Sequence, residues 1–330
     1  MRALASRSAL AVRRRAGLLI SLVSLVGFVF WAARQEAPTF PTAPDDLVLL
    51  GVAVLVYAGV TLVRGWRWHR IMRHNGVPHE RSDAFALCAV GYAGNNVLPA
   101  RGGELLRIFL LSGRSGARKR DVLGSAIAEW ALDALALVLL IVVLSITRVA
   151  DSSPGDTQAV TAFVLLGVAV AGAAAALYLR RRERLERAFA LIRPIVAASR
   201  NLLGLWGLVL FAITAGLWIL EGVIVWLVGK SLGLEVSVVE GVFVLVLAGM
   251  FAVIPSAPGY VGTFDAGMAV ALGRLGIGDG TAVAYALLVR FVLYVPITFV
   301  GLALLVFRHG GLGVLRSRSW SGEATLRRDA

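Results

Sequence analysis

The sequence predicts an all-α integral membrane protein with six membrane-spanning helices and two opposed re-entrant helical hairpins. Of its 330 residues, 58% are hydrophobic, a fraction that excludes an ordinary soluble domain. Many apolar residues fall in runs of about 20, the length at which an α-helix crosses a bilayer. Between these runs the lysines and arginines gather in alternate loops, as in proteins that cross a membrane several times.

Six uninterrupted apolar segments account for the predicted spans. They cover residues 17–33, 47–63, 122–147, 161–179, 205–228 and 281–307. The first follows three arginines, as a signal peptide would. However, Trp31 stands at position −3 of the best cleavage point, after Ala33, where a small residue is needed. We therefore expect an uncleaved helix.

Basic residues predict the orientation of these spans. Of the 33 lysines and arginines, 26 lie in residues 1–16, 64–83, 113–121, 180–203 and 308–330. The loops with a single basic residue are 34–46, 148–158, 230–240 and 273–280. Because short cytoplasmic loops are enriched in lysine and arginine, the basic segments are expected inside the cell and the others outside.

Two further apolar stretches, 84–111 and 236–272, are interrupted in their middle by polar and helix-breaking residues. The first lies between two basic segments and the second between two charge-poor ones, so each should enter and leave on one side. Both are predicted to be re-entrant hairpins that point at each other, with both chain termini in the cytoplasm. The first contains "VLPARGGELLRI" and the second "VIPSAPGYVGTF". Their shared Val-x-Pro and order of elements predict an inverted pseudo-repeat.

A single polytopic domain is expected over residues 17–307. Residues 1–16 are predicted to form a basic cytoplasmic N-terminus, and residues 308–330 a basic, disordered cytoplasmic tail. The longest polar interval, about 180–200, is too short for a separate soluble catalytic domain. Any chemistry is therefore expected in or at the membrane.

Candidate functional residues lie at the hairpin breaks. Non-helical backbone at membrane depth is tolerated only inside protein or beside a wet cavity, so the breaks should face inward. A helix that restarts after a break presents free backbone N–H groups, which suit an anion such as phosphate. The candidates are Asn95, Asn96, Pro99, Arg101, Gly103, Glu104 and Arg107 in the first hairpin, and Pro255, Pro258, Gly259, Gly262 and Asp265 in the second. Among them, the prolines and glycines, together with Gly102, are expected to break the helices.

Charged residues in the spans complete the candidate site. Glu129 and Asp133 are four residues apart and share one helix face. Arg290 lies at a depth comparable to Glu129, so these two are expected to meet near the midplane, and Glu221 is also deep. A charge in hydrocarbon costs about 2.5–3.5 kcal/mol on insertion scales, so such residues normally face partners or water.

Structural roles stay open for the same residues. The charges of the first hairpin could form salt bridges that only hold the shape of that hairpin. Glu129, Asp133 and Arg290 in the spans could form ion pairs with a purely structural role. Asn95 and Asn96 could equally satisfy the freed backbone of the break.

Several functional classes have no support in the sequence. Cys88 is the only cysteine, so neither an intrachain disulfide nor a cysteine-rich metal site is possible. The basic residues behind the formal charge of +13 flank apolar segments without a recognition-helix pattern, so nucleic-acid binding is not expected. The four histidines lack metal-ligand spacing, and no P-loop, nucleophile elbow or zinc-protease motif occurs. We expect no metal, no cofactor and no enzyme activity.

The motif Asn-x-x-Pro-x-Arg-x-Gly-Glu-x-x-Arg runs from Asn96 to Arg107. Together with "EWALD", "PSAPGYVGTFD" and the arginine of the last helix, it resembles the flippase-like membrane domain family of lysylphosphatidylglycerol synthases, over about residues 10–308. In two-domain relatives, the family's membrane part translocates the aminoacylated phosphatidylglycerol that a soluble transferase domain makes. This chain has no counterpart of that soluble domain, so synthesis of the lysyl-lipid is not expected.

The sequence favours a multi-pass lipid transporter of the cell membrane, which moves a charged-headgroup phospholipid or lipid-linked intermediate between leaflets. Arg101, Arg107 and Arg290 are expected to contact phosphate, while the nearby carboxylates orient those arginines, bind a cationic headgroup or relay protons. The expected partners are membrane lipids, with a homo-oligomer or a separate lipid-modifying enzyme as further candidates.

Two other classes stay open. One is a membrane-embedded lipid-modifying transferase that uses Glu129 and Asp133 as a general base or as metal ligands. Dependence on a divalent metal or a sugar nucleotide would favour it. The other is a non-transporting envelope-assembly partner, in which replacing the buried charges would affect only folding.

Overall fold

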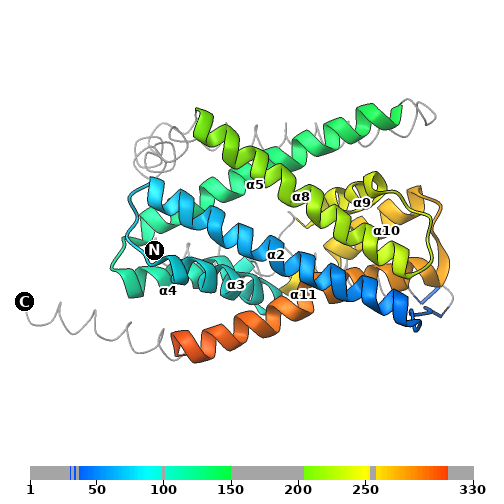
Figure 1. Ribbon diagram of the computed structural model, residues 1–330, viewed down its shortest axis with the longest axis horizontal. Coiled ribbons are helices and arrows are strands. Elements are labelled where there is room, and N and C mark those ends of the chain that lie inside the picture. The colour runs from blue at the N-terminus through cyan, green and yellow to red at the C-terminus, as the bar shows by residue number, and fades with distance from the viewer. Residues whose placement is uncertain are drawn as a thin grey trace, which may run out of the picture.

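The computed structural model describes residues 30, 33–34, 37–98, 101–149, 204–252 and 258–310, and every regular element within these ranges is a helix (Figure 1). The elements are α2 (Pro44–His74), α3 (Arg81–Val97), α4 (Gly102–Ser115), α5 (Lys119–Val149), α8 (Leu205–Ser231), α9 (Val238–Phe251), the 3-10 helix η2 (Pro258–Tyr260), α10 (Thr263–Arg274) and α11 (Asp279–His309). The predicted all-α class is confirmed for this part of the chain.

Four of these helices, α2, α5, α8 and α11, are long and apolar enough to cross a membrane. They contain the predicted spans 47–63, 122–147, 205–228 and 281–307. The spans predicted at 17–33 and 161–179 fall outside the described residues, apart from Phe30 and Ala33. The N-terminal segment and the tail after residue 310 also fall outside them. Six crossings therefore stay a prediction.

Local sequence explains where several helices begin and end. Pro44 begins α2, followed by Asp45 and Asp46 in the first turn, where acidic groups suit the helix dipole. α9 begins with a capping box, because Ser237 accepts from the backbone N–H of Glu240 while the Glu240 carboxylate accepts from the N–H of Ser237.

The order long, short, short, long occurs twice along the described chain. α2, α3, α4 and α5 form a first unit, and α8, α9, α10 and α11 form a second. α8 ends at Ser231, 157 residues after α2 ends at His74, and α9 begins at Val238, 157 residues after α3 begins at Arg81. In Figure 1, α2 and α8 run in opposite directions across the molecule, as do α5 and α11. The second unit therefore has the opposite direction to the first.

In each unit the two short helices pack against each other as a helical hairpin. α3 and α4 approach closely because Gly103 faces the backbone of Gly91, where a Cβ atom would have no room. α9 and α10 approach closely where Gly267 faces Ala248. These helix pairs correspond to the two stretches that the sequence predicted as broken hairpins.

The hairpins come from opposite ends of the molecule, with α3 and α4 on the left of Figure 1 and α9 and α10 on the right. Arg101 at the first tip and Tyr260 at the second both have φ 56°, a left-handed conformation that costs a non-glycine residue about 1–2 kcal/mol. Arg101 Nη2 donates to the carbonyl of Ala252 at 3.2 Å, and its guanidinium lies 5.5 Å from the ring centre of Tyr260. The two tips thus contact each other.

Two expectations about local structure are wrong. Gly102 and Gly103 do not break the first hairpin, because α4 begins at Gly102 and Gly103 serves the close approach of α3. Arg64 and Arg67 do not belong to a cytoplasmic loop, because α2 continues to His74 and buries both side chains. They lie on the face of α2 that also buries Tyr57, Val60, Trp68 and Ile71, so helical periodicity carries them inward.

Candidate functional site

A cavity of about 370 Å³ lies where the hairpin tips meet the long helices. Its lining includes aromatic side chains from both units, namely Tyr57, Tyr92, Trp130, Trp218, Tyr260, Phe264 and Tyr294. Eight of the predicted site residues line it: Asn95, Asn96, Arg101, Glu104, Arg107, Glu129, Asp133 and Glu221. Arg64 and Arg67, which were not predicted as site residues, line it as well.

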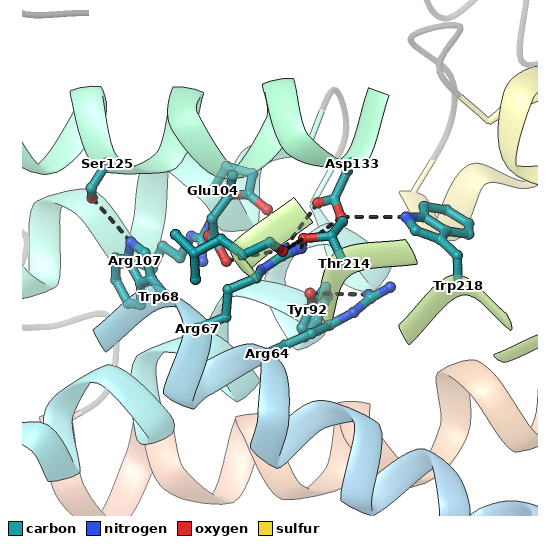
Figure 2. A network of polar contacts seen from close by, with 12 residues as sticks. Arg64, Arg67, Trp68, Tyr92, Glu104, Arg107, Ser125, Asp133, Thr214 and Trp218 are labelled. Carbon is teal, nitrogen blue, oxygen red and sulfur yellow. Dashed lines mark hydrogen bonds and ion pairs between the residues drawn. The ribbon is translucent and has the colours of Figure 1, made fainter. Parts of the chain in front are cut away.

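Arg67 of α2 lies at the centre of the charged network beside this cavity (Figure 2). Its Nη1 and Nη2 donate to the two carboxylate oxygens of Asp133 at 2.9 and 3.1 Å, a bidentate pairing. Nη2 also donates to Glu129 at 3.3 Å, and Nη1 to the hydroxyl of Thr214 at 2.8 Å. Arg67 is 1% exposed, so its charge depends on these partners.

Glu129 joins this arginine to a second one. Its other oxygen accepts from Arg107 Nη2 at 2.9 Å, and Arg107 also pairs with Glu104 at 2.5 Å. Asn95 holds Glu104 on both sides, because its amide donates to the carboxylate and its oxygen accepts from the backbone N–H, each at 3.2 Å. The guanidinium of Arg107 lies 4.4 Å from the ring centre of Trp68.

Arg64 connects the two units. Its Nη2 lies 2.8 Å from the Glu221 carboxylate of α8, and its Nη1 donates to the Tyr92 hydroxyl of α3 at 3.1 Å. Trp218, also from α8, donates from its indole N–H to Asp133 at 3.3 Å, as Figure 2 shows. The shift of 157 residues that relates the helix ends also carries Arg64 to Glu221.

Arg101 differs from the other cavity arginines. Among the described residues, no carboxylate lies within ion-pair distance of it; it contacts the Ala252 carbonyl and the Tyr260 ring. The remaining cavity charges are three arginines, each paired with at least one of four carboxylates. The cavity lining therefore combines one arginine without a carboxylate partner among the described residues and a network with one more carboxylate than arginine.

Arg290 does not meet Glu129, contrary to the expectation. It pairs with Asp265 of α10, at 2.5 and 2.9 Å, and its Nη1 donates to the carbonyl of Gly259 at 3.0 Å. Asp265 also accepts from the backbone N–H of Gly262 at 2.8 Å. This pair lies beside the cavity and holds the restart of α10 against α11. Asp133 and Arg290 are again 157 residues apart, so the two units carry charge at equivalent places.

Pro258 and Gly259 shape the backbone of the second tip, and Asn96 also has a packing role besides lining the cavity. Pro258 begins η2, and Gly259 takes a left-handed φ of 65° within it. Asn96 donates to the Thr298 hydroxyl at 2.8 Å and to the Tyr294 carbonyl at 3.3 Å, which attaches the first hairpin tip to α11. Pro99 and Pro255 fall outside the described residues.

A chain whose described part contains four membrane-length apolar helices and a charged interior of this kind is a multi-pass membrane protein. It belongs to the family described as the lysylphosphatidylglycerol synthase TM region, whose model matches residues 16–301. It is also 24% identical over 314 residues to a "UPF0104 membrane protein" of Methanothermobacter thermautotrophicus, a similarity that covers 87% of this chain and 93% of that relative. The family match confirms the resemblance inferred from the first hairpin motif.

Proposed function

We propose that this protein moves a lipid with a charged headgroup between the leaflets of the cell membrane. The observation that carries the proposal is a cavity of about 370 Å³ that is lined by eight charged side chains and enclosed by membrane-length helices and two opposed hairpin tips. Buried charge is costly, so a cavity of this kind in a membrane protein marks a path for a polar group. Opposed broken helices are the usual site of such a path in transporters.

Arg101 is the proposed contact for the headgroup phosphate. Its guanidinium has donors to spare, since within the described residues it donates one hydrogen bond, to the Ala252 carbonyl. A guanidinium matches a phosphate bidentately. The paired arginines and carboxylates then shape the cavity around the headgroup. Their surplus of one carboxylate suits a positively charged part of a headgroup.

The charge distribution supports a membrane orientation for this proposal. The end of the molecule where α2, α4 and α11 finish carries Arg70, Arg73, Arg114, Arg118 and Arg308, whereas α2 begins at the other end with Asp45 and Asp46. We assign the basic end to the cytoplasm. Both hairpins are then re-entrant from opposite faces, the two units form an inverted pseudo-repeat, and both termini are cytoplasmic. Membrane lipids are the proposed partners, with a second copy or a lipid-modifying enzyme as further candidates.

A lipid-modifying transferase is the less favoured alternative. Its proposed catalytic carboxylates, Glu129 and Asp133, already accept hydrogen bonds from Arg67 and Arg107, which leaves them poorly suited to bind a metal or remove a proton. An assembly partner without transport activity would not need a cavity. We therefore propose a transporter rather than an enzyme.

The test is a leaflet-accessibility assay on purified protein in liposomes containing fluorescently labelled phosphatidylglycerol or phosphatidylethanolamine, quenched from outside by dithionite. Arg101→Gly removes the guanidinium while glycine accepts the left-handed φ of 56°, so the fold should be kept. A charge-assisted hydrogen bond contributes about 1.5–3 kcal/mol, so we expect translocation to slow by about tenfold or more.

The matched control is Arg120→Ala, because Arg120 pairs with Asp121 at the start of α5, outside the cavity, and its side chain is 64% exposed. It should translocate lipid as the wild type does. If folded wild-type protein quenched no faster than empty liposomes for any labelled lipid, the proposal would be wrong. If Arg101→Gly matched the wild type, the role of Arg101 would be wrong.

A further inference from the structure

The two units make unequal seams with each other. In one seam α3 of the first unit packs along α11 of the second, and in the equivalent seam α9 of the second packs along α5 of the first. The side chains in the two seams differ in size and polarity, although the helices occupy equivalent places in the repeat.

The α3–α11 seam is close and polar. Gly301 of α11 faces Ala89 and Ala93 of α3, so the two backbones come together where a side chain would not fit. Polar contacts join α3 and α11 at both ends of this seam. Asn96 donates to Thr298 at the hairpin tip, and Arg308 pairs with Asp83 at 3.1 Å at the basic end. Separating these helices within a bilayer would leave polar groups without partners, which lipid cannot replace.

The α5–α9 seam is bulky and apolar. Its buried cluster consists of Leu137, Leu140, Ile141 and Leu144 from α5 with Val242 and Val246 from α9. The shift of 157 residues relates Leu144 to Gly301 and Val246 to Ala89, so large side chains here replace the small ones of the other seam. Apolar side chains lose little when lipid chains replace a neighbouring helix. This seam is therefore the easier one to open.

The cavity extends to the inner end of this same seam. Ala134 and Leu137 on α5 and Leu245 and Gly249 on α9 all line it. One turn before Leu137, the side chain of Asp133 is 26% exposed, whereas that of Glu129 is 4% exposed. The most accessible carboxylate of the network thus lies on α5 beside the apolar seam.

We propose that the α5–α9 seam is a lateral portal, through which a lipid headgroup enters the cavity while the acyl chains remain between α5 and α9. The inference rests on the proposed lipid-moving function and names its entrance. The α3–α11 seam stays closed and acts as the support against which the portal opens. Apolar walls at the portal and charged walls in the cavity match the two parts of a phospholipid.

The test is reversible cross-linking in the liposome assay, on a Cys88→Ala background that removes the native thiol. Ile141→Cys with Val246→Cys places two thiols across the portal, because both side chains lie in its buried cluster. A short thiol-specific cross-linker should reduce translocation to the rate of empty liposomes, and a reductant should restore it. Ser82→Cys with Arg308→Cys, joined by a longer flexible reagent, is the matched control across α3–α11, where the two side chains form a hydrogen bond. Lipid translocation by the Ser82→Cys/Arg308→Cys protein should not change on cross-linking.

Each outcome has a separate meaning. Translocation that persists after complete cross-linking of Ile141→Cys/Val246→Cys overturns the portal but leaves lipid movement standing. Arrest by both cross-links also overturns it, since the portal would not be specific to α5 and α9. If the wild type, the Cys88→Ala protein and the uncross-linked pairs all fail to translocate lipid although they are folded, the proposed function fails and the portal with it.

Discussion

Glu129 links two helices through its carboxylate. Its two oxygens accept from arginines of different helices, Arg67 of α2 and Arg107 of α4, so it joins a long helix to the first hairpin. Its side chain is 4% exposed. A buried carboxylate in this position cannot be hydrated, and its charge is stable only while the arginines remain. The same contacts that enclose the cavity therefore also hold the helices together.

Replacing Arg67 tests this dependence. Arg67→Ala leaves Asp133 without its bidentate partner and Glu129 with one arginine, so we expect a loss of about 3–5 kcal/mol in stability. Thermal unfolding in detergent, followed by tryptophan fluorescence, should show a clearly lowered midpoint. Arg67→Ala with Asp133→Asn should recover part of it, because one unpaired charge is removed. A midpoint equal to that of the exposed-site variant Arg120→Ala would contradict the prediction.

At the scale of elements, the first hairpin depends on glycine for its closeness. Gly103 of α4 meets the backbone of α3, and this approach places Glu104 within reach of Asn95, and Arg107 within reach of Glu129. A larger residue would separate the two short helices and move these charges away from their partners. The packed helices position the charged network, and the break between α3 and α4 positions Arg101.

Gly103→Ala should therefore be harmful although it adds one methyl group. The added carbon has no room against the α3 backbone, so we expect a loss of about 1–3 kcal/mol, typical of overpacking, together with reduced lipid translocation. Gly51→Ala in α2 is the matched control, because no atom lies within 4 Å of the added carbon and alanine favours the helix by about 0.5–1 kcal/mol. Equal unfolding midpoints for the two variants would show that the close approach is not needed.

At the scale of the whole molecule, two units of opposite direction meet along α2 and α8, with one hairpin from each end. This arrangement puts a break from each unit beside one cavity. It also brings the basic ends of α4 and α11 together, because Arg114 and Arg308 both pair with Asp83. One end of the molecule is therefore basic.

The proposed topology predicts which side of the membrane each hairpin faces. On the Cys88→Ala background, Glu80→Cys and Arg118→Cys flank the first hairpin, and Glu235→Cys and Gly278→Cys flank the second; all four positions are exposed. A membrane-impermeant maleimide added to intact cells should label only the second pair, and the first pair should react after permeabilisation. Labelling of Glu80→Cys and Arg118→Cys from opposite sides would show that the first hairpin crosses the membrane.

Much of the fold could be predicted because its signals are local. A run of about 20 apolar residues predicts a span from hydropathy alone, and proline and glycine within such a run predict a break. Glu129 and Asp133 were correctly placed on one face by their spacing, and both line the cavity. Arg67 was missed because an arginine near the end of a span looks like a loop residue; extending the helical period from Val60 to Ile71 would have found it.

The pairing partners of these charges could not be predicted from the sequence. Hydropathy, helix breaks and spacing along a helix depend on neighbours in the chain, so the amino-acid order was enough to predict a helical membrane protein with two broken hairpins and charged residues inside it. Ion pairing depends on distances of a few ångströms between helices far apart in the chain. Only the packing of the helices shows that Arg290 joins Asp265, that Glu129 joins two arginines, and that Arg101 has no carboxylate partner among the described residues.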